Sequence, residues 1–385
     1  MNTQLQAALG QLGNFAGTDQ PFLTVYADLM PQGNGQRPAI RQIEQELERI
    51  VGELNLHDVA REQLLGDQQR IVDYIEREVP REAAGAAIFA CAAENAWMAL
   101  PLYAPVETYV AVGPTPHAFQ LARIADDYET FALVVAEGQQ AQIYVVASNR
   151  VEHVAETEAA EKIKRFEAGG QAQMIFQRRT DNVIKAHLKD LSSELERVVD
   201  QQSVDHIIIS SNDAIKGMVQ EQLAQRLQAM VVEYINFDPH AGNAAMMDTL
   251  APIMQRVERE QEQQLTTDLA NEVGANARGV AGLAETALAL SKGQVRVLVL
   301  HRTFQALGRT NPTTGFLYAP GYLNDPYDGS ELSEIDLREA FVSRALGQGA
   351  MIEVVDDSDY LAEHDGVGAL LHYRDDLAAK QAGSR

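Results

Sequence analysis

Gly169, Gly170 and Gln171 form a Gly-Gly-Gln triplet in a polar stretch, FEAGGQAQ, that leads into a predicted long helix. Glycine gives the backbone access to positive φ and lets it approach a ligand closely. Glutamine is neutral, so it donates and accepts hydrogen bonds but does not act as a general base. If the triplet is catalytic, its chemistry is the positioning of a water molecule against an electrophile.

Basic residues surround the triplet. Residues 161–189 carry seven Lys or Arg against three Asp or Glu, which is +4 in a chain of net charge −24 and leaves −28 for the rest. They are candidates for contacts to RNA phosphates, because local charge decides such contacts. The simpler alternative is a solvated helix face, where Lys and Arg are common. The basic residues are Lys162, Lys164, Arg165, Arg178, Arg179, Lys185 and Lys189.

A β-hairpin and a long helix are predicted to position the triplet. FALVVA and AQIYVVA, separated by EGQQ, have the pattern of a hairpin, with a third strand over 150–155. Residues 156–171 are polar and predict a long loop whose first part is compatible with a helix, and loops of this length tend to be functional. Apolar residues at helical spacing predict a helix over 172–200. The other elements predicted for this domain, residues 128–243, are a strand at VDHIIIS, a helix over 213–227 and a strand over 230–235.

The parts on either side also alternate helices and strands, which predicts three α/β domains with mixed sheets flanked by helices. The first domain, residues 1–127, has no catalytic spacing and no assigned role. Its predicted elements are strands over 22–26, 86–92, 98–103 and 106–112 and helices over 40–54, 59–79 and 117–125.

The third domain, residues 244–385, begins with a charged helix. Lys292 and Gly293 predict the end of its second helix, and residues 310–328, rich in proline and tyrosine, predict an irregular stretch. Its predicted elements are helices over 244–273, 279–291 and 330–346 and strands at VRVLVL, 351–355 and 367–373.

Composition restricts the class of protein. The 46% hydrophobic and 22% charged content are typical of a soluble globular chain. Cys91 is the only cysteine and lies in an apolar run, so we expect a buried thiol, no internal disulfide and no cysteine-based zinc site. No signal peptide or membrane span is recognisable, which predicts a cytoplasmic protein that does not contact membranes. Nothing in the sequence specifies an oligomeric state.

Other polar groups have simpler explanations than a site. Asp238, His240 and Asp248 could hold a metal, but a polar linker accounts for them. The acidic run over 356–365 could bind a cation, although a solvated surface or a helix N-terminus is the simpler explanation. We therefore expect no metal and no cofactor.

Two further clusters and several absent motifs complete the survey. Asp205-His206 precedes a buried strand and is more typical of a turn than of a catalytic dyad. Tyr318, Tyr322 and Tyr327 could stack on a base or a partner, and packing within the irregular stretch explains them equally well. Gly-x-Ser-x-Gly, the P-loop and the dinucleotide fingerprint are absent from the sequence, which removes the commoner enzyme classes.

With the triplet between a hairpin and a long helix, the chain resembles the archaeal and eukaryotic class I release factors, and in particular their bacterial relatives. GLAETALALSKGQVRVLVL resembles the segment that opens the sheet of the family's C-terminal domain, and GVGALLHYR resembles its closing strand. The resemblance covers roughly residues 128–374. It implies that the third domain is an α-β-α sandwich like that of release factors and Pelota.

The resemblance implies a function. Gly169 and Gly170 would shape the loop, and Gln171 would coordinate, largely through its backbone N–H, a water that hydrolyses the ester of peptidyl-tRNA on the ribosome. An acyl ester needs an oriented water and a stabilised oxyanion, and backbone amides can supply the latter. The basic residues would meet tRNA and ribosomal RNA, and a translational GTPase is a possible further partner.

The departures from the family pattern narrow this function. Arg165, Phe166, Glu167 and Ala168 stand where family members often have Lys-His-Gly-Arg, and the signatures that read stop codons are absent. The cysteine-rich insertion of some relatives has no counterpart in residues 310–328. We therefore predict peptide release in ribosome rescue, without stop-codon reading. The alternatives are a non-catalytic stress or hibernation factor in the tRNA site, and an RNA- or partner-binding module that does not act on ribosomes.

Overall fold

The computed structural model describes residues 2–15, 20–31, 38–54, 56–127, 129–147, 150–161, 171–237 and 242–374. The chain forms two compact units. The central unit comprises Met1–Gln4 and Tyr128–Glu260, and the composite unit comprises Leu5–Asp127 and Gln261–Arg385. The division into domains 1–127, 128–243 and 244–385 stays a prediction. None of the described helices combines the length and apolar character that a bilayer span requires.

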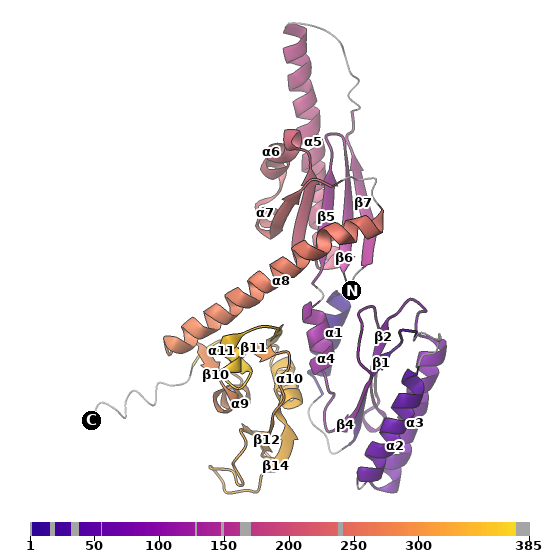
Figure 1. The fold of residues 1–385 in the computed structure, drawn as a ribbon, viewed down its shortest axis with the longest axis vertical. Coiled ribbons are helices and arrows are strands. Elements are labelled where there is room, and N and C mark those ends of the chain that lie inside the picture. Colours follow the sequence, from indigo (N-terminus) through magenta and orange to yellow (C-terminus); the bar gives the residue numbers. More distant parts are fainter. Residues whose placement is uncertain are drawn as a thin grey trace, which may run out of the picture. The chain divides into compact units, whose positions relative to one another are not determined.

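A five-stranded sheet is the framework of the central unit (Figure 1). Its elements are β5 (Phe131–Ala136), β6 (Gln140–Ala147), β7 (Arg150–Glu158), α5 (Gln171–Gln202), β8 (His206–Ser211), α6 (Asp213–Gln222), α7 (Gln225–Met230), β9 (Val231–Ile235) and the first part of α8 (Asn243–Gly274). The strand order is β7-β6-β5-β8-β9, with β5 antiparallel to β6 and parallel to β8. The hairpin and the long helix predicted from the sequence are thus confirmed.

Both faces of this sheet are covered by apolar packing, because alternate residues of each strand point to opposite faces. On one face, Leu188 and Leu195 of α5 pack with Val134 and Ile143 of the strands. On the other, Leu250 of α8 packs with apolar residues of β5. The sheet is therefore a rigid base for α5.

The first part of the composite unit is an antiparallel sheet in the order β3-β2-β1-β4. Its elements are α1 (Asn2–Leu12), β1 (Phe22–Asp28), α2 (Ala39–Glu53), α3 (Asp58–Arg77), β2 (Gly85–Cys91), η1 (Ala92–Glu94), β3 (Ala96–Leu102), β4 (Tyr109–Gly113) and α4 (Phe119–Asp127). Ile43 and Leu47 of α2 and Ile71 of α3 are buried against one sheet face. Cys91 is buried and free, as predicted.

The second part of the composite unit contains two sheets. Its elements are β10 (Gly279–Ala281), α9 (Leu283–Ser291), β11 (Val295–His301), β12 (Leu307–Thr310), β13 (Leu317–Tyr318), β14 (Ser333–Asp336), α10 (Leu337–Gly347), β15 (Met351–Val355), α11 (Asp359–Ala362) and β16 (Val367–Leu371). The larger sheet has the order β10-β16-β11-β15 and the smaller β13-β12-β14. The segment GLAETALALSKGQVRVLVL contains α9 and most of β11, and the segment GVGALLHYR contains β16. They meet as antiparallel neighbours, with Leu298 opposite Ala369.

Polar links join the two parts of the composite unit at α4. The Phe119 N–H donates to Glu339 Oε2 of α10 at 3.1 Å, and the Val354 N–H of β15 donates to Asp126 Oδ2 at 2.7 Å. Arg302 binds Asp127 through two hydrogen bonds of 2.8 and 3.1 Å. Burial raises the pKa of the Asp126 carboxyl well above its usual value, and the nearby Glu353 raises it further.

Two predictions for the central unit were wrong. Residues Glu156–Glu158 extend strand β7 instead of starting the predicted long loop, because they pair with Gln140–Gln142 of β6. The helix expected over 213–227 is two helices, since Leu223 is extended, with φ −68° and ψ 137°. The Ser192 hydroxyl of α5 accepts the Ala224 N–H at 3.0 Å, which replaces a hydrogen bond within a continuous helix.

Three predictions for the last part of the chain were also wrong. Residues Gly279–Ala281 are a strand paired with β16, and the helix begins after Gly282, whose φ of +89° is not helical. Residues Ser333–Asp336 are a strand paired with β12, so α10 begins only at Leu337. The stretch 310–328, expected to be irregular, contributes β13 to the small sheet.

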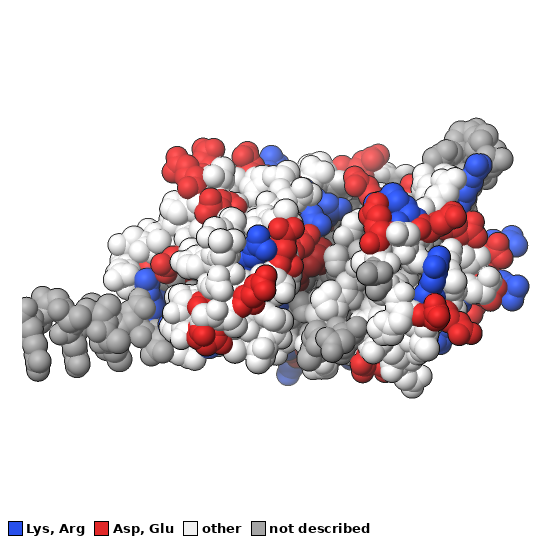
Figure 2. Space-filling view, turned by 90° about the horizontal axis from the view of Figure 1, so that it is seen from below, with Lys and Arg blue, Asp and Glu red and all other residues white. Residues whose placement is uncertain are grey.

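Acidic residues dominate the charge of the chain, at 55 Asp and Glu against 31 Lys and Arg. On the face drawn in Figure 2, Asp and Glu side chains form several groups, with Lys and Arg beside many of them. A contact to a polyanion therefore needs a local basic surface.

Candidate functional site

Helix α5 begins at Gln171, the last residue of the triplet. The first four N–H groups of a helix have no acceptor within it, so the Gln171 N–H is free of intrahelical bonding. The Gln171 side chain lies outside the described part of the structure. The same holds for five other predicted site residues, Gly169, Gly170, Lys162, Lys164 and Arg165.

The N-terminal part of α5 extends past the end of the sheet (Figure 1). The turn between β5 and β6 lies level with Ile184, because a Cβ built on Gly138 would meet Ile184 Cδ1 at 3.4 Å. Thr157, near the end of β7, is hydrogen-bonded to His187, one turn further along the helix. Residues 171–183 therefore project beyond the hairpin, by about 20 Å at 1.5 Å per residue.

Three exposed side chains mark the projecting part of α5. Met174, Arg178 and Arg179 are all exposed to solvent. Arg179 forms an ion pair with Glu161, beyond the end of β7. No acidic partner of Arg178 lies within 4 Å among the described residues. Its guanidinium is available to an anionic ligand, to which it can present up to five donors.

The basic residues of α5 line up along the helix. Arg178, Lys185 and Lys189 are seven and four residues apart, a spacing that returns to nearly the same direction at 3.6 residues per turn. Lys185 lies 3.5 Å from Glu221 of α6, which partly offsets its charge, whereas Lys189 is exposed. The predicted RNA-binding residues that the structure describes thus form one stripe, with Arg179 beside it.

His187 fixes α5 to the sheet, a role that the sequence reading did not assign. Its side chain is buried, and Nε2 lies 2.9 Å from Thr157 Oγ1 and 3.2 Å from the Thr157 carbonyl oxygen. Nδ1 is buried without a hydrogen-bond partner among the described residues. A polar residue at a core-facing position of an amphipathic helix is the sequence signal for such an anchor.

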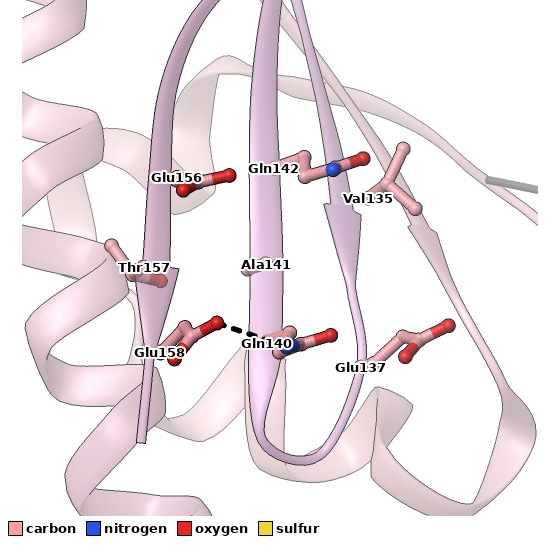
Figure 3. Close-up of a pocket in the computed structure, with 8 residues that line it drawn as sticks. All are labelled: Val135, Glu137, Gln140, Ala141, Gln142, Glu156, Thr157 and Glu158. Atoms are coloured by element: carbon pink, nitrogen blue, oxygen red, sulfur yellow. Dashed lines mark hydrogen bonds between the residues drawn. The ribbon is translucent and has the colours of Figure 1, made fainter. Parts of the chain in front are cut away.

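A depression of about 260 Å³ lies at the hairpin end of the central sheet (Figure 3). Gln140 and Gln142 alternate along β6 with Ala141 and Ile143, which join the core beneath α5, so the two glutamines lie on the opposite face. The carboxylates of Glu137, Glu156 and Glu158 line the depression and would repel a phosphate, so the basic stripe on α5 is the better surface for RNA. The lining residues are Val135, Glu137, Gln140, Ala141, Gln142, Glu156, Thr157 and Glu158.

The remaining polar groups have structural roles. Asp205 accepts the Thr130 N–H at 2.8 Å, and His206 Nε2 lies 2.9 Å from Glu129 Oε2. Ser358 caps α11 within the acidic run by accepting the Leu361 N–H at 3.1 Å. These contacts stabilise turns and helix ends.

The described residues contain no cluster of His, Cys, Asp and Glu suited to a metal ion. Asp248 is an exposed residue of α8, whereas Asp238 and His240 lie outside the described residues. The predicted absence of a metal stays a prediction for the chain as a whole.

Residues 116–262 match the family model described as bacterial archaeo-eukaryotic release factor family 10. The matched range contains the triplet and all seven basic candidates. No curated protein matches the sequence.

Several solved structures are distantly similar. The archaeal translation termination factor aRF1 shares 16% identity over 97% of this chain and 98% of its own, with a TM-score of 0.27. Dom34 of S. cerevisiae, described as a translation termination-like factor, shares 12% over 75% and 79%, with a TM-score of 0.43. Pelota of Archaeoglobus fulgidus shares 14% over 77% and 82%, with a TM-score of 0.31.

These TM-scores are all below 0.5, so the identification rests on the family match and on the residues inside it. The match spans the end of the first part of the chain, the whole central sheet with α5, and α8 as far as residue 262. Over residues 116–262 the chain is therefore related to the class I release factors, through the family of bacterial archaeo-eukaryotic release factors.

Proposed function

We propose that the protein is a ribosome-associated release or rescue factor that promotes hydrolysis of the peptidyl-tRNA ester at Gly169, Gly170 and Gln171. The observation that carries this proposal is the start of α5 at Gln171, at the end of a helix that projects beyond its sheet. A projecting helix can bring a loop to a centre that the body of the domain does not enter.

The chemistry follows from the backbone at this point. The Gln171 N–H has no acceptor within α5, so it can hold the attacking water or the oxyanion that develops on the ester carbonyl. The two preceding glycines let the backbone approach the ester closely. The acceleration comes from orientation of the water and electrostatic stabilisation, without a charged base.

The basic stripe supports contact with RNA. Arg178, Lys185 and Lys189 lie on one face of α5, and Arg179 lies beside it on the projecting part. Phosphates of tRNA or ribosomal RNA are suitable partners for this face, whereas the acidic depression on the sheet is not. A translational GTPase is a further proposed partner. Stop-codon reading is not part of the proposal, because the sequence lacks the signatures for it.

Peptide release tests the mechanism. Stalled ribosomes carrying labelled peptidyl-tRNA are incubated with wild type, Gly170→Ala and Gln171→Ala, and free peptide is measured over time. We expect Gly170→Ala to lower the rate by about 100-fold or more, because a Cβ at this position should keep the backbone from approaching the ester closely enough for the Gln171 N–H to act as the oxyanion donor. Gln171→Ala should lower it less, because its backbone N–H remains.

Gly217→Ala is the matched control. Gly217 lies in α6 of the same unit, and apart from its chain neighbours and the backbone of its own helix no described atom lies within 4 Å of a Cβ built there. It should therefore release peptide at the wild-type rate. Equal rates for wild type and Gly170→Ala would reject the mechanism. Binding to ribosomes without release by any variant would instead favour a non-catalytic factor that occupies the tRNA site.

A further inference from the structure

Exposed apolar side chains gather on residues 316–331 of the composite unit. Tyr322, Leu323 and Tyr327 are 45%, 74% and 78% exposed. Tyr322 lies 5.6 Å from Tyr318 between ring centroids, and Tyr327 lies 6.4 Å from Phe316. Large apolar side chains that gather on a surface mark interaction sites more often than isolated ones do.

A buried polar network holds this loop in one conformation. Asn311 Nδ2 donates to Asp325 Oδ2 at 2.6 Å, and the Tyr318 hydroxyl donates to the same oxygen at 2.9 Å. The Tyr327 N–H donates to Asp325 Oδ1 at 2.8 Å. The Asn311 hydrogen bond lowers the pKa of Asp325, which keeps the carboxylate ionised. Tyrosines presented on a rigid loop lose little conformational entropy when a partner binds.

The charge around the tyrosines selects the partner. Residues 307–336 contain five acidic residues and one basic residue, a net charge of −4. The basic residue, Arg309, already lies 3.8 Å from Glu334. The guanidinium of Arg344 in α10 also reaches this loop, where it donates to the Gly315 carbonyl oxygen. Asp328 and Glu331 are exposed beside the tyrosines. Nucleic-acid phosphates are repelled by this charge, whereas a cationic protein segment is attracted to it.

We propose that the surface formed by residues 316–331 docks an arginine-containing segment of a protein partner. A guanidinium can stack on an exposed tyrosine ring while it pairs with a neighbouring carboxylate, a combination that lysine reproduces poorly. Leu323 supplies an apolar contact for the stem of such a side chain. This surface lies on the composite unit, so the inference does not depend on peptide release by the central unit.

Fluorescence anisotropy with labelled octa-arginine and octa-lysine tests the proposal on the full chain. Octa-arginine should bind the wild type more tightly than octa-lysine does. Tyr322→Ala with Tyr327→Ala should weaken octa-arginine about 5-fold or more, the loss expected for two cation–π contacts. Tyr327→Ala alone, at the most exposed of these positions, gives a partial loss and guards against misfolding of the double variant.

Tyr373→Ala is the matched control, because Tyr373 is 54% exposed and lies outside this surface. It should bind octa-arginine as the wild type does. Equal binding of the two peptides, or equal binding by wild type and double variant, would overturn the proposal. Two other results would also overturn the proposal. If the wild type self-associates and the double variant does not, the occupant is a second copy of the chain; if the wild type binds single-stranded RNA and the double variant does not, the occupant is a nucleic acid.

Discussion

Glu339 is a buried carboxyl group at the joint between the two parts of the composite unit. It accepts the N–H of Phe119, the first residue of α4, and the Arg338 guanidinium lies over the Phe119 ring at 4.9 Å from its centroid. Burial raises the pKa of Glu339 to about 7, although the Phe119 hydrogen bond and Arg338 oppose this. The folded chain therefore keeps a proton that the unfolded chain releases near pH 4.5.

His117, close to this joint, titrates in the opposite sense. Burial lowers its pKa to about 4 from 6.5. The ring Nδ1 of His117 lies 2.8 Å from the Tyr109 hydroxyl, and the backbone N–H of His117 donates to Thr24 Oγ1 at 3.0 Å. Between pH 4 and 6.5 the unfolded chain binds more protons at His117, so this residue makes stability rise with pH. Glu339 makes stability fall as pH rises from 4.5 to 7.

Glu339→Gln should remove the fall in stability that Glu339 causes as pH rises and should leave the effect of His117 in place. The fold should be kept, because the amide oxygen of glutamine can still accept the Phe119 N–H. The stability of the variant relative to wild type should increase between pH 4.5 and 7, by up to about 3 kcal/mol at about 1.4 kcal/mol per pKa unit. Urea unfolding followed by fluorescence of Trp97, the single tryptophan and a residue of the same unit, measures it. Parallel stability curves for the two proteins would contradict it.

At the scale of elements, the sequence predicts the helices and strands whose formation depends on the pattern of apolar residues within the element itself. The period of apolar residues in α5 and the alternation in the β5–β6 hairpin arise from burial against one core, and both were predicted correctly. The break at Leu223 has no glycine or proline to announce it and depends on Ser192, 31 residues earlier. The strands β10 and β14 exist because distant strands pair with them.

In the candidate site, too, some features could be predicted from the local sequence and others depend on contacts between distant residues. The triplet and the basic residues could be identified as candidates from the sequence, because their residue types and spacing alone indicate the chemistry. The projection of α5 was not, since it depends on where the hairpin turn lies against Ile184. The anchor between His187 and Thr157 joins residues 30 positions apart, and helical spacing alone marks His187 only as core-facing.

Loss of the His187 anchor should loosen α5 at its contact with β7. His187→Ala removes the hydrogen bond to Thr157 and leaves a cavity, which should destabilise the central unit by about 2–4 kcal/mol. Amides of α5 should then exchange faster with deuterium, as measured by mass spectrometry. Lys189→Ala, at an exposed position of the same helix, should change stability by less than about 0.5 kcal/mol. Unchanged exchange in His187→Ala would show that the apolar contacts alone hold the helix.

On the scale of the whole molecule, one basic stripe must act against a strongly acidic chain. The net charge of −24 repels a polyanion at long range, and salt screens this repulsion. Contacts from Arg178, Lys185 and Lys189 to phosphates act in the opposite sense, because salt weakens them by restoring counterions to the RNA. The salt dependence of ribosome binding therefore reports which of the two dominates.

Replacement of Arg178, Lys185 and Lys189 by glutamine should weaken ribosome binding and flatten its dependence on salt. If each residue contacts one phosphate, the slope of log K against log salt should fall in magnitude by about 2–3, measured by co-sedimentation between about 50 and 200 mM salt. The control with the same change of charge replaces Arg41, Arg61 and Arg77, exposed residues of α2 and α3, by glutamine. The control should keep the wild-type slope, because its residues contact no phosphate. Equal slopes for both triple variants would mean that net charge, and not the stripe on α5, governs binding.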